Sequence, residues 1–197
     1  MKKIRKITII RIILLFIIAV LLLFPFDSAG ITFLNLFVNE MIVINIKYII
    51  IAFFFALSIL TNFIESRMLK KNGENSNNTL VSDDVFNKIL VDTILIVLSS
   101  QGFIHPFIPI IVIGRDSIVN YIRNIALSKG KEIKENNTSK FKNILIMLGI
   151  FLTLIYNLPF ELINIKLSDI ILIIATTLAA VSCIQYYSEN KKIVNQK

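Results

Sequence analysis

The chain has 197 residues, of which 55% are hydrophobic, and its mean hydropathy is +0.76. A composition this apolar excludes an ordinary soluble domain and is typical of an integral membrane protein. The single cysteine, Cys183, excludes an intramolecular disulfide. The formal net charge is +8, which we attribute mainly to membrane topology and which would also hold the protein against anionic lipid headgroups.

Apolar runs divide the chain into predicted transmembrane helices, since a bilayer core requires roughly 20 residues. They lie near residues 8–26, 41–60, 85–101, 104–125, 142–158 and 168–187. No small-residue cleavage site follows the first run, so we interpret it as a retained helix. The shorter apolar stretch 31–38 is expected to lie along the membrane surface. We therefore predict an all-α integral membrane protein, a single membrane domain over residues 1–197 with about six transmembrane helices in one bundle.

Lysine and arginine lie almost entirely on one side of these predicted spans. The connections before the first span, after the second, after the fourth and after the sixth hold 17 of the 21 basic residues. The opposite connections, 27–40, 101–106 and 158–167, contain only Lys166. By the positive-inside rule, both termini and the polar segment 61–88 are expected to be cytoplasmic. Because the basic residues belong to separate loops without interleaved aromatic residues, nucleic-acid binding is not predicted.

The polar segment 61–88 carries acidic and amide side chains at helical spacings. Asn62 and Glu65 are three residues apart, and Asp83 and Asn87 are four apart, so each pair falls on one face of a predicted helix. If both faces converge on one site, they offer the oxygen ligands that Mg²⁺ prefers. Only Glu65 and Asp83 carry negative charge. We therefore expect one divalent cation at most, weakly bound.

Three basic residues, Arg11, Lys47 and Arg115, lie within or at the edge of apolar runs. Charge inside a bilayer is costly, so each is a functional candidate. For Lys47, near an end of its run, we expect the side chain to reach the headgroup level instead. Arg115 is followed by Asp116 and lies eight residues before Arg123. The two arginines therefore share one helix face near the predicted cytoplasmic end.

These residues resemble those of the CDP-alcohol phosphatidyltransferases, and within that family the phosphatidylglycerophosphate synthases. The family signature is D-x2-D-G-x2-A-R-x8-G-x3-D-x3-D, and this chain keeps its spacing while most identities differ. The eight signature positions are occupied, in order, by Asn62, Glu65, Ser66, Leu69, Lys70, Thr79, Asp83 and Asn87.

Short pieces outside the signature extend the resemblance along nearly the whole chain. They are Ile7, Thr8 and Arg11 near the start; Gly114, Arg115, Asp116 and Arg123 in the fourth predicted span; Ser128, Lys129 and Gly130 after it; Lys140 and Lys142 at the fifth span; and Ser182, Tyr186 and Asn190 in the sixth. The resemblance implies a multi-pass protein of the cell membrane that acts in phospholipid biosynthesis.

The resemblance also implies a definite chemistry. Family members use Mg²⁺ or Mn²⁺, held by the signature carboxylates, to bind the pyrophosphate of a CDP-linked lipid, and an acceptor hydroxyl then displaces CMP. In the synthase branch the donor is CDP-diacylglycerol and the acceptor is glycerol 3-phosphate. Members of the family often form homodimers.

Carried over position by position, the resemblance makes Glu65, Asp83 and, weakly, Asn62 the metal ligands. It places Asn87 where the family has its general base, although an amide has no titratable proton acceptor. The positions implied for binding the CDP-linked lipid are Ser66, Lys70 and Thr79, and those implied for the acceptor phosphate are Arg115, Arg123, Lys129, Lys140 and Lys142.

Two functions from different classes follow from this sequence. The first is a divergent phosphatidylglycerophosphate synthase-like transferase, which works with Glu65 and Asp83 on one metal ion. The second is a catalytically inactive family member that binds lipid or a partner protein in the membrane.

Overall fold

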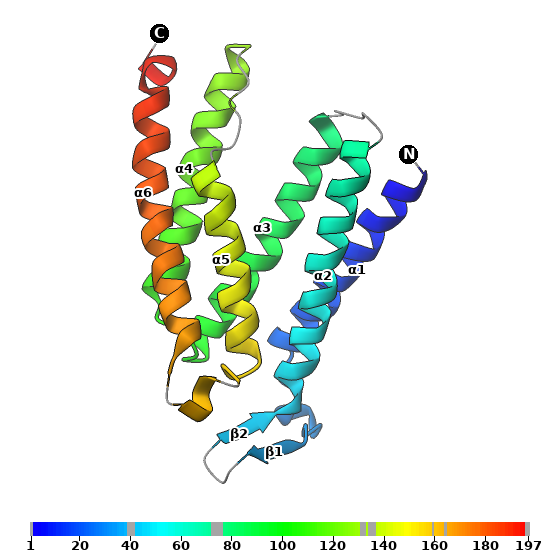
Figure 1. Ribbon diagram of the computed structural model, residues 1–197. Coiled ribbons are helices and arrows are strands. Elements are labelled where there is room, and N and C mark those ends of the chain that lie inside the picture. The colour runs from blue at the N-terminus through cyan, green and yellow to red at the C-terminus, as the bar shows by residue number, and fades with distance from the viewer. Residues whose placement is uncertain are drawn as a thin grey trace. The chain divides into compact units, whose positions relative to one another are not determined.

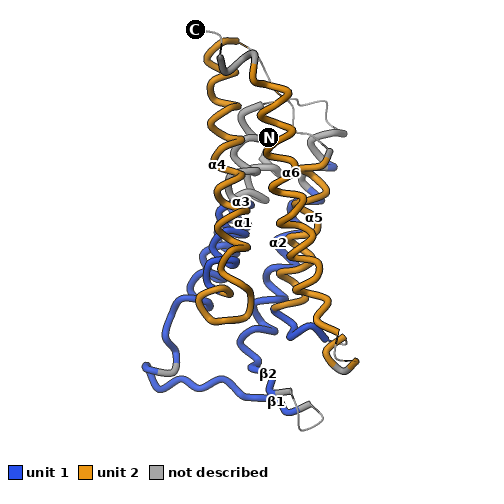
Figure 2. The backbone as a smooth tube through the Cα atoms, turned by 90° about the vertical axis from the view of Figure 1, so that its left-hand side faces the viewer, with its two compact units in different colours: residues 1–97, 154–158 blue, residues 98–153, 159–197 orange. Residues whose placement is uncertain are grey.

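The computed structural model describes residues 2–38, 42–71, 77–130, 133, 137–158, 160–163 and 165–195. It has two compact units, the first comprising residues 1–97 with 154–158 and the second comprising residues 98–153 with 159–197 (Figure 2). The α-helices of the described part are α1 (Lys2–Leu23), α2 (Ile46–Lys71), α3 (Asn77–Ser100), α4 (Phe107–Ser128), α5 (Asn137–Leu154) and α6 (Leu167–Asn195) (Figure 1). Short 3-10 helices lie at Asp27–Ala29 and Phe160–Ile163.

A helix accounts for most of each predicted apolar run. Three helices extend well beyond their runs, because α2 continues to Lys71, α3 begins at Asn77 and α6 continues to Asn195. Hydropathy marks only the apolar part of a helix, so polar turns that continue it are not visible in the apolar pattern.

The predicted start of the second helix, at residue 41, was wrong. Strands β1 (Asn35–Val38) and β2 (Ile42–Asn45) pair antiparallel, with Asn35 opposite Asn45 and Val38 opposite Ile42 (Figure 1). Their β-branched and aromatic residues favour strands, but a short apolar run has no period that separates a strand from a helix. The helix begins only at Ile46, where Asn45 Oδ1 accepts a hydrogen bond from the backbone N–H of Lys47 at 2.9 Å. This is the usual role of an N-cap residue.

In the first unit, α1 packs against α2. The buried residues of α1 recur every fourth position, at Leu14, Ile18 and Leu22, and those of α2 include Ile51 and Phe55. This spacing places each set on one helix face, so the two faces form an apolar contact.

In the second unit, α4 and α6 lie side by side (Figures 1 and 2). The buried face of α6 consists largely of small residues, which let helices approach closely. Its members are Ser168, Leu172, Ala175, Thr176, Ala179, Ser182, Tyr186 and Asn190. On α5, a Cβ added to Gly149 would lie 2.6 Å from Leu172 Cδ2 of α6. A side chain at this position would therefore force Leu172 of α6 to move.

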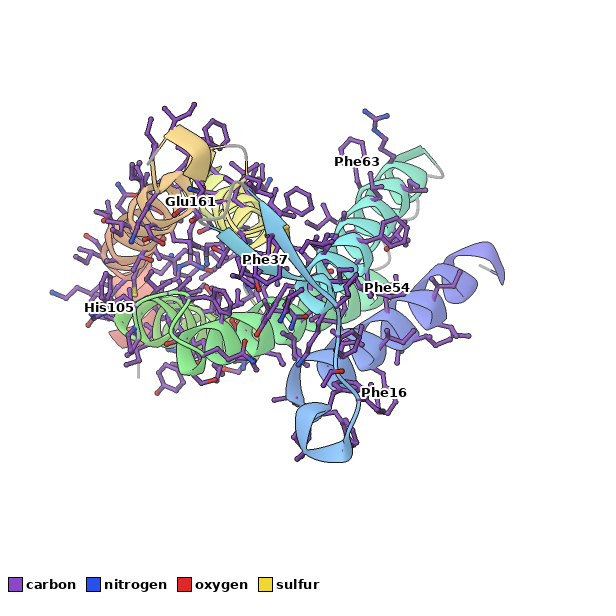
Figure 3. The ribbon with its side chains drawn as sticks, turned by 90° about the horizontal axis from the view of Figure 1, so that it is seen from below. Phe16, Phe37, Phe54, Phe63, His105 and Glu161 are labelled. Carbon is purple, nitrogen blue, oxygen red and sulfur yellow. The ribbon has the colours of Figure 1, made fainter. Side chains whose placement is uncertain are left out.

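The described helices and the hairpin of β1 and β2 present many large apolar side chains at the surface. Phe16 is 68% exposed and Phe37 is 73% exposed, and both are labelled in Figure 3. By length and composition, two helical segments of the described residues are able to cross a membrane, Ile46–Ile64 and Leu167–Lys191, and Ile12–Leu23 is a shorter apolar helix. Exposed apolar surface on this scale marks an interaction with membrane or protein.

Candidate functional site

The signature positions lie at the adjoining ends of two consecutive helices in the first unit. Asn62 and Glu65 are in the C-terminal part of α2, and Asp83 and Asn87 are in the N-terminal part of α3 (Figure 1). Because both segments are helical, each pair shares one helix face. Convergence of the two faces on one site is a proposal.

Of these four side chains, the structure describes those of Asn62 and Asn87, which are both half-buried. The side chains of Glu65 and Asp83 lie outside the described residues. The same holds for the other signature positions, although their backbone is helical. These are Ser66, Leu69, Lys70 and Thr79. Among the side chains that are described, no group of three or more His, Cys, Asp or Glu is close enough to hold a metal ion.

A buried ionic network connects α4 and α5 in the second unit. Asp116 Oδ1 accepts hydrogen bonds from Arg115 Nη1 at 2.7 Å and from Lys142 Nζ at 2.9 Å. The side chains of Arg115, Lys142 and Asp116 are 4%, 0% and 10% exposed. Removing one partner from such a group leaves an uncompensated buried charge. Asp116 is therefore what allows two cations to lie between these helices.

Two serines complete the network around the Arg115 guanidinium. Its Nε donates a hydrogen bond to Ser182 Oγ of α6 at 3.1 Å, and its Nη2 donates one to Ser139 Oγ of α5. Ser182 Oγ in turn donates to the carbonyl oxygen of Ala179 at 3.0 Å. The guanidinium is thus held by side chains from three helices, and its fork geometry fixes their register.

The other predicted acceptor-phosphate residues lie outside this network. Arg123 is half-buried on α4, and Lys129 and Lys140 are exposed at the end of α4 and the start of α5. At the end of α4, the N–H of Gly130 donates to the carbonyl of Leu127 at 2.9 Å, and Gly130 has a φ of +69°. The Ser-Lys-Gly piece is therefore a helix end, since glycine takes a left-handed conformation without strain.

The sequence analysis also named Lys47 and Arg11, and the chain has one histidine, His105. The Nζ atom of Lys47 lies 5.4 Å from the ring centroid of Phe26 and 6.0 Å from that of Tyr48. At this distance a cation–π contact stabilises the ammonium group. His105 is exposed in the turn between α3 and α4 and is labelled in Figure 3. The side chain of Arg11 lies outside the described residues.

Sequence reasoning missed the part played by Asp116 and Ser139. Asp116 was noted only as the residue after Arg115 and as part of the resemblance, and Ser139 was not singled out. The available signal was the charge pattern, because a lysine or arginine inside an apolar bundle needs an acid there. Asp116 lies within the same predicted span as Arg115, and Ser139 and Lys142 are three residues apart on α5.

Comparisons with known proteins identify the family and two relatives of this chain. The chain is 27% identical over 185 residues to the CDP-diacylglycerol–glycerol-3-phosphate 3-phosphatidyltransferase of Bacillus subtilis, a match that covers 94% of this chain and 93% of that protein. It is also 27% identical over 107 residues to the protein of the same name from Mycoplasma genitalium, over 54% of this chain and 45% of that protein. A family model for CDP-alcohol phosphatidyltransferases matches residues 5–181. With a match over nearly its whole length, this chain belongs to the CDP-alcohol phosphatidyltransferase family.

Proposed function

We propose that this chain is a divergent phosphatidylglycerophosphate synthase-like transferase. It moves the phosphatidyl group of CDP-diacylglycerol to glycerol 3-phosphate and releases CMP. The observation that carries the proposal is the match to the Bacillus subtilis protein along 94% of this chain. The family is one of transferases, which favours an enzyme over a catalytically inactive lipid-binding protein.

We place this activity in a membrane-spanning bundle. Exposed apolar side chains on the described helices support a lipid-facing surface, and α2 and α6 each contain a segment able to span. The placement of 17 basic residues on one side of the six predicted spans supports cytoplasmic termini and a cytoplasmic signature. The proposal is a multi-pass protein of the cell membrane with one membrane domain over residues 1–197.

The donor set of the signature suits one divalent cation better than two. Glu65 and Asp83 supply two negative charges, which balance one Mg²⁺ or Mn²⁺, and Asn62 adds a neutral carbonyl oxygen. A second ion would lack the carboxylates that the family signature supplies. When bound, such an ion neutralises the pyrophosphate charge and orients the in-line displacement.

Asn87 orients the acceptor in this proposal without removing its proton. Its amide oxygen is able to accept a hydrogen bond from the attacking hydroxyl of glycerol 3-phosphate. The hydroxyl oxygen bonds to the β-phosphorus of CDP-diacylglycerol, the bond from that phosphorus to CMP breaks, and the proton passes to water. A missing general base slows catalysis by about 10²- to 10⁴-fold, so we expect slow turnover.

The positive side chains of α4 and α5 hold the acceptor phosphate in two ways. Arg115 and Lys142 share one carboxylate, so their network keeps one net positive charge inside the helices. Arg123, Lys129 and Lys140 lie nearer the surface, where an anion is able to reach them. We assign direct phosphate contacts to these three residues, and to Arg115 and Lys142 a role in helix register and in the local field.

The test is CMP release by the purified protein given CDP-diacylglycerol, glycerol 3-phosphate and Mg²⁺ or Mn²⁺. We expect metal-dependent release that an Asp83→Ala variant loses by at least about 10²-fold, because the ion then has one carboxylate ligand. Glu189→Gln, which changes an exposed acid of α6, serves as the matched control. If the unaltered chain releases no more CMP in response to metal than the Asp83→Ala variant does, the transferase is refuted. The catalytically inactive lipid-binding or partner-binding protein would then be the remaining function.

A further inference from the structure

A pocket lies in the second unit, where the turn from α3 to α4 meets the start of α6. Its volume is about 550 Å³, and it is lined by residues of this turn and, at the start of α6, by Lys166, Asp169 and Ile173. Figure 3 views the molecule from this end and labels His105, which also lines the pocket. Small-molecule sites have volumes of roughly 300–1,000 Å³, so this pocket is large enough for a ligand. The described residues that line it include no signature position and no member of the ionic network.

The turn from α3 to α4 is held by backbone hydrogen bonds. The N–H of Gly102 donates to the carbonyl of Ser99 at 3.1 Å, and the N–H of Phe103 donates to the carbonyl of Leu98 at 2.9 Å. Gly102 has a φ of +79°, which glycine adopts without strain. These two bonds and the glycine form a Schellman motif, a common way to end a helix. This side of the pocket is therefore fixed by the fold and does not depend on a ligand.

Lys166 carries a charge that the helix after it does not favour. Its carbonyl accepts the N–H of Ile170 at 3.2 Å, so Lys166 occupies the N-cap position of α6. Lysine is not a preferred N-cap residue, and a cation is unfavourable beside the positive end of a helix. The connections predicted to lie opposite the cytoplasm contain no other basic residue, so topology does not explain the charge either. An anion held in the pocket would explain it.

The pocket also presents a carboxylate and a hydrogen-bond donor. Asp169 is half-buried and lies three residues after Lys166. Both side chains are described, and no ion pair joins them. The Nδ1 atom of His105 accepts the N–H of Phe107 at 3.5 Å, so the neutral imidazole carries its proton on Nε2 and donates from there. The lining thus offers a cation, a neutral donor and an anion to one ligand.

We propose that this pocket binds the headgroup of a zwitterionic phospholipid, one that carries a phosphodiester and a primary ammonium group. Lys166 and His105 contact the phosphodiester, and Asp169 contacts the ammonium group. A headgroup with a phosphate alone would leave the Asp169 carboxylate facing a negative ligand. Ile173 lines the pocket and is 49% exposed on α6, so an acyl chain is able to continue from the pocket along the apolar surface of that helix. This site goes beyond the proposed transferase, and in the proposed topology it faces away from the cytoplasm.

The experiment measures the binding of phosphatidylethanolamine to the purified full chain in detergent by native mass spectrometry. Phosphatidylglycerol with the same acyl chains is the comparison ligand, because it has the phosphodiester without the ammonium group. Exposed ion pairs are worth roughly a factor of 2 to 5 in affinity. We expect Lys166→Gln to weaken the binding of both lipids by about that factor, and Asp169→Asn to weaken only the binding of phosphatidylethanolamine. Asp169→Glu keeps the charge and should keep the selectivity.

Two variants at the other end of α6 are matched controls for the loss of charge. Lys191→Gln and Glu189→Gln alter exposed side chains there and should bind both lipids like the unaltered chain. Unchanged affinity for phosphatidylethanolamine in Lys166→Gln and Asp169→Asn would overturn the inference. Equal losses for the two lipids in Asp169→Asn would also overturn it, because the carboxylate would then not recognise the ammonium group.

Thermal stability without added lipid separates a binding role of Lys166 from a structural one. Lys166→Gln removes a cation from the positive end of α6, so its melting temperature should be unchanged or higher. The rise in melting temperature that phosphatidylethanolamine causes should shrink in the same variant. A lower melting temperature without lipid would show that Lys166 serves the fold, and would contradict the proposal.

A soluble ligand and the transferase assay complete the test. Glycerophosphoethanolamine has the same headgroup without acyl chains and should bind more weakly than the lipid, whereas equal affinity would refute a lipid site. CMP release by Lys166→Gln should equal that of the unaltered chain, because the pocket contains no signature residue. An inactive chain that binds the lipid through Lys166 and Asp169 would refute the transferase alone. An active chain whose lipid binding is indifferent to both residues would refute this site alone.

Discussion

Two regions of the molecule differ in how their charges are paired. One is the signature at the ends of α2 and α3, and the other is the ionic network of α4, α5 and α6. In the signature, amides stand where the family has its first and last acids, and Glu65 and Asp83 remain. In the network, Arg115 and Lys142 both have Asp116 as a hydrogen-bonded partner. In the proposed function, the first region has fewer carboxylates than the family signature, whereas in the second both cations are paired with one carboxylate.

This difference indicates in which region substitutions should change activity and in which they should change stability. A buried ion pair that loses one member leaves a charge without a partner, so the fold itself selects against its loss. Asn62 and Asn87 are half-buried, so we expect a change from acid to amide at such positions to leave the fold intact. The intact network is therefore evidence about the fold, and the signature is where activity must be tested.

The largest expected effect is on stability, from Asp116→Asn. The variant leaves Arg115 and Lys142 buried without their counter-ion, which should lower the free energy of unfolding by about 3–5 kcal/mol. Denaturation of the purified protein in mixed micelles measures this change. Combining it with Lys142→Met removes one of the stranded charges and should recover part of the loss. A single variant within about 0.5 kcal/mol of the unaltered chain, the range of ordinary surface changes, would show that the network does not stabilise the fold.

The second prediction restores charge to the signature. Asn87→Asp returns a carboxylate to the position of the family's general base, so CMP release should rise by at least about 10-fold while the free energy of unfolding stays the same. Adding Asn62→Asp should also tighten Mn²⁺ binding. Asn120→Asp, at an exposed position of α4, controls for the added charge. A rise no larger than that of Asn120→Asp would show that the two signature faces do not meet.

The smallest expected effect concerns helix packing, at a position outside both the signature and the ionic network. Gly149→Val should lower the free energy of unfolding by about 1–3 kcal/mol, since the new side chain collides with Leu172. Leu172→Ala in the same chain should recover part of that loss, which a double-mutant cycle measures. Nothing lies within 4 Å of a Cβ added at Gly114, so Gly114→Val is the matched control. Equal losses at both glycines would contradict close packing of α5 on α6.

Much of the helical architecture was predictable, because long apolar runs leave few alternatives. The hairpin of β1 and β2 was not, since one predicted apolar run, 41–60, holds both β2 and the start of α2. The burial of Arg115 followed from its place in an apolar run. Its partners Ser139 and Ser182 did not, because they lie 24 and 67 residues away along the chain and one sequence contains no register between helices. The hydroxyl of Tyr186 is buried and has no hydrogen-bond partner among the described residues, which is visible only once the side chains are packed.

The most direct test of a one-cation signature is to count the Mn²⁺ ions bound per chain by electron paramagnetic resonance. Purified protein is titrated with Mn²⁺ in the presence of CDP-diacylglycerol, and a variant with Glu65→Gln and Asp83→Asn is titrated alongside. We predict one specific ion per chain in the unaltered protein and none in the double variant, because these carboxylates supply the signature's negative charge. Equal binding by the two proteins would contradict a cation held by Glu65 and Asp83.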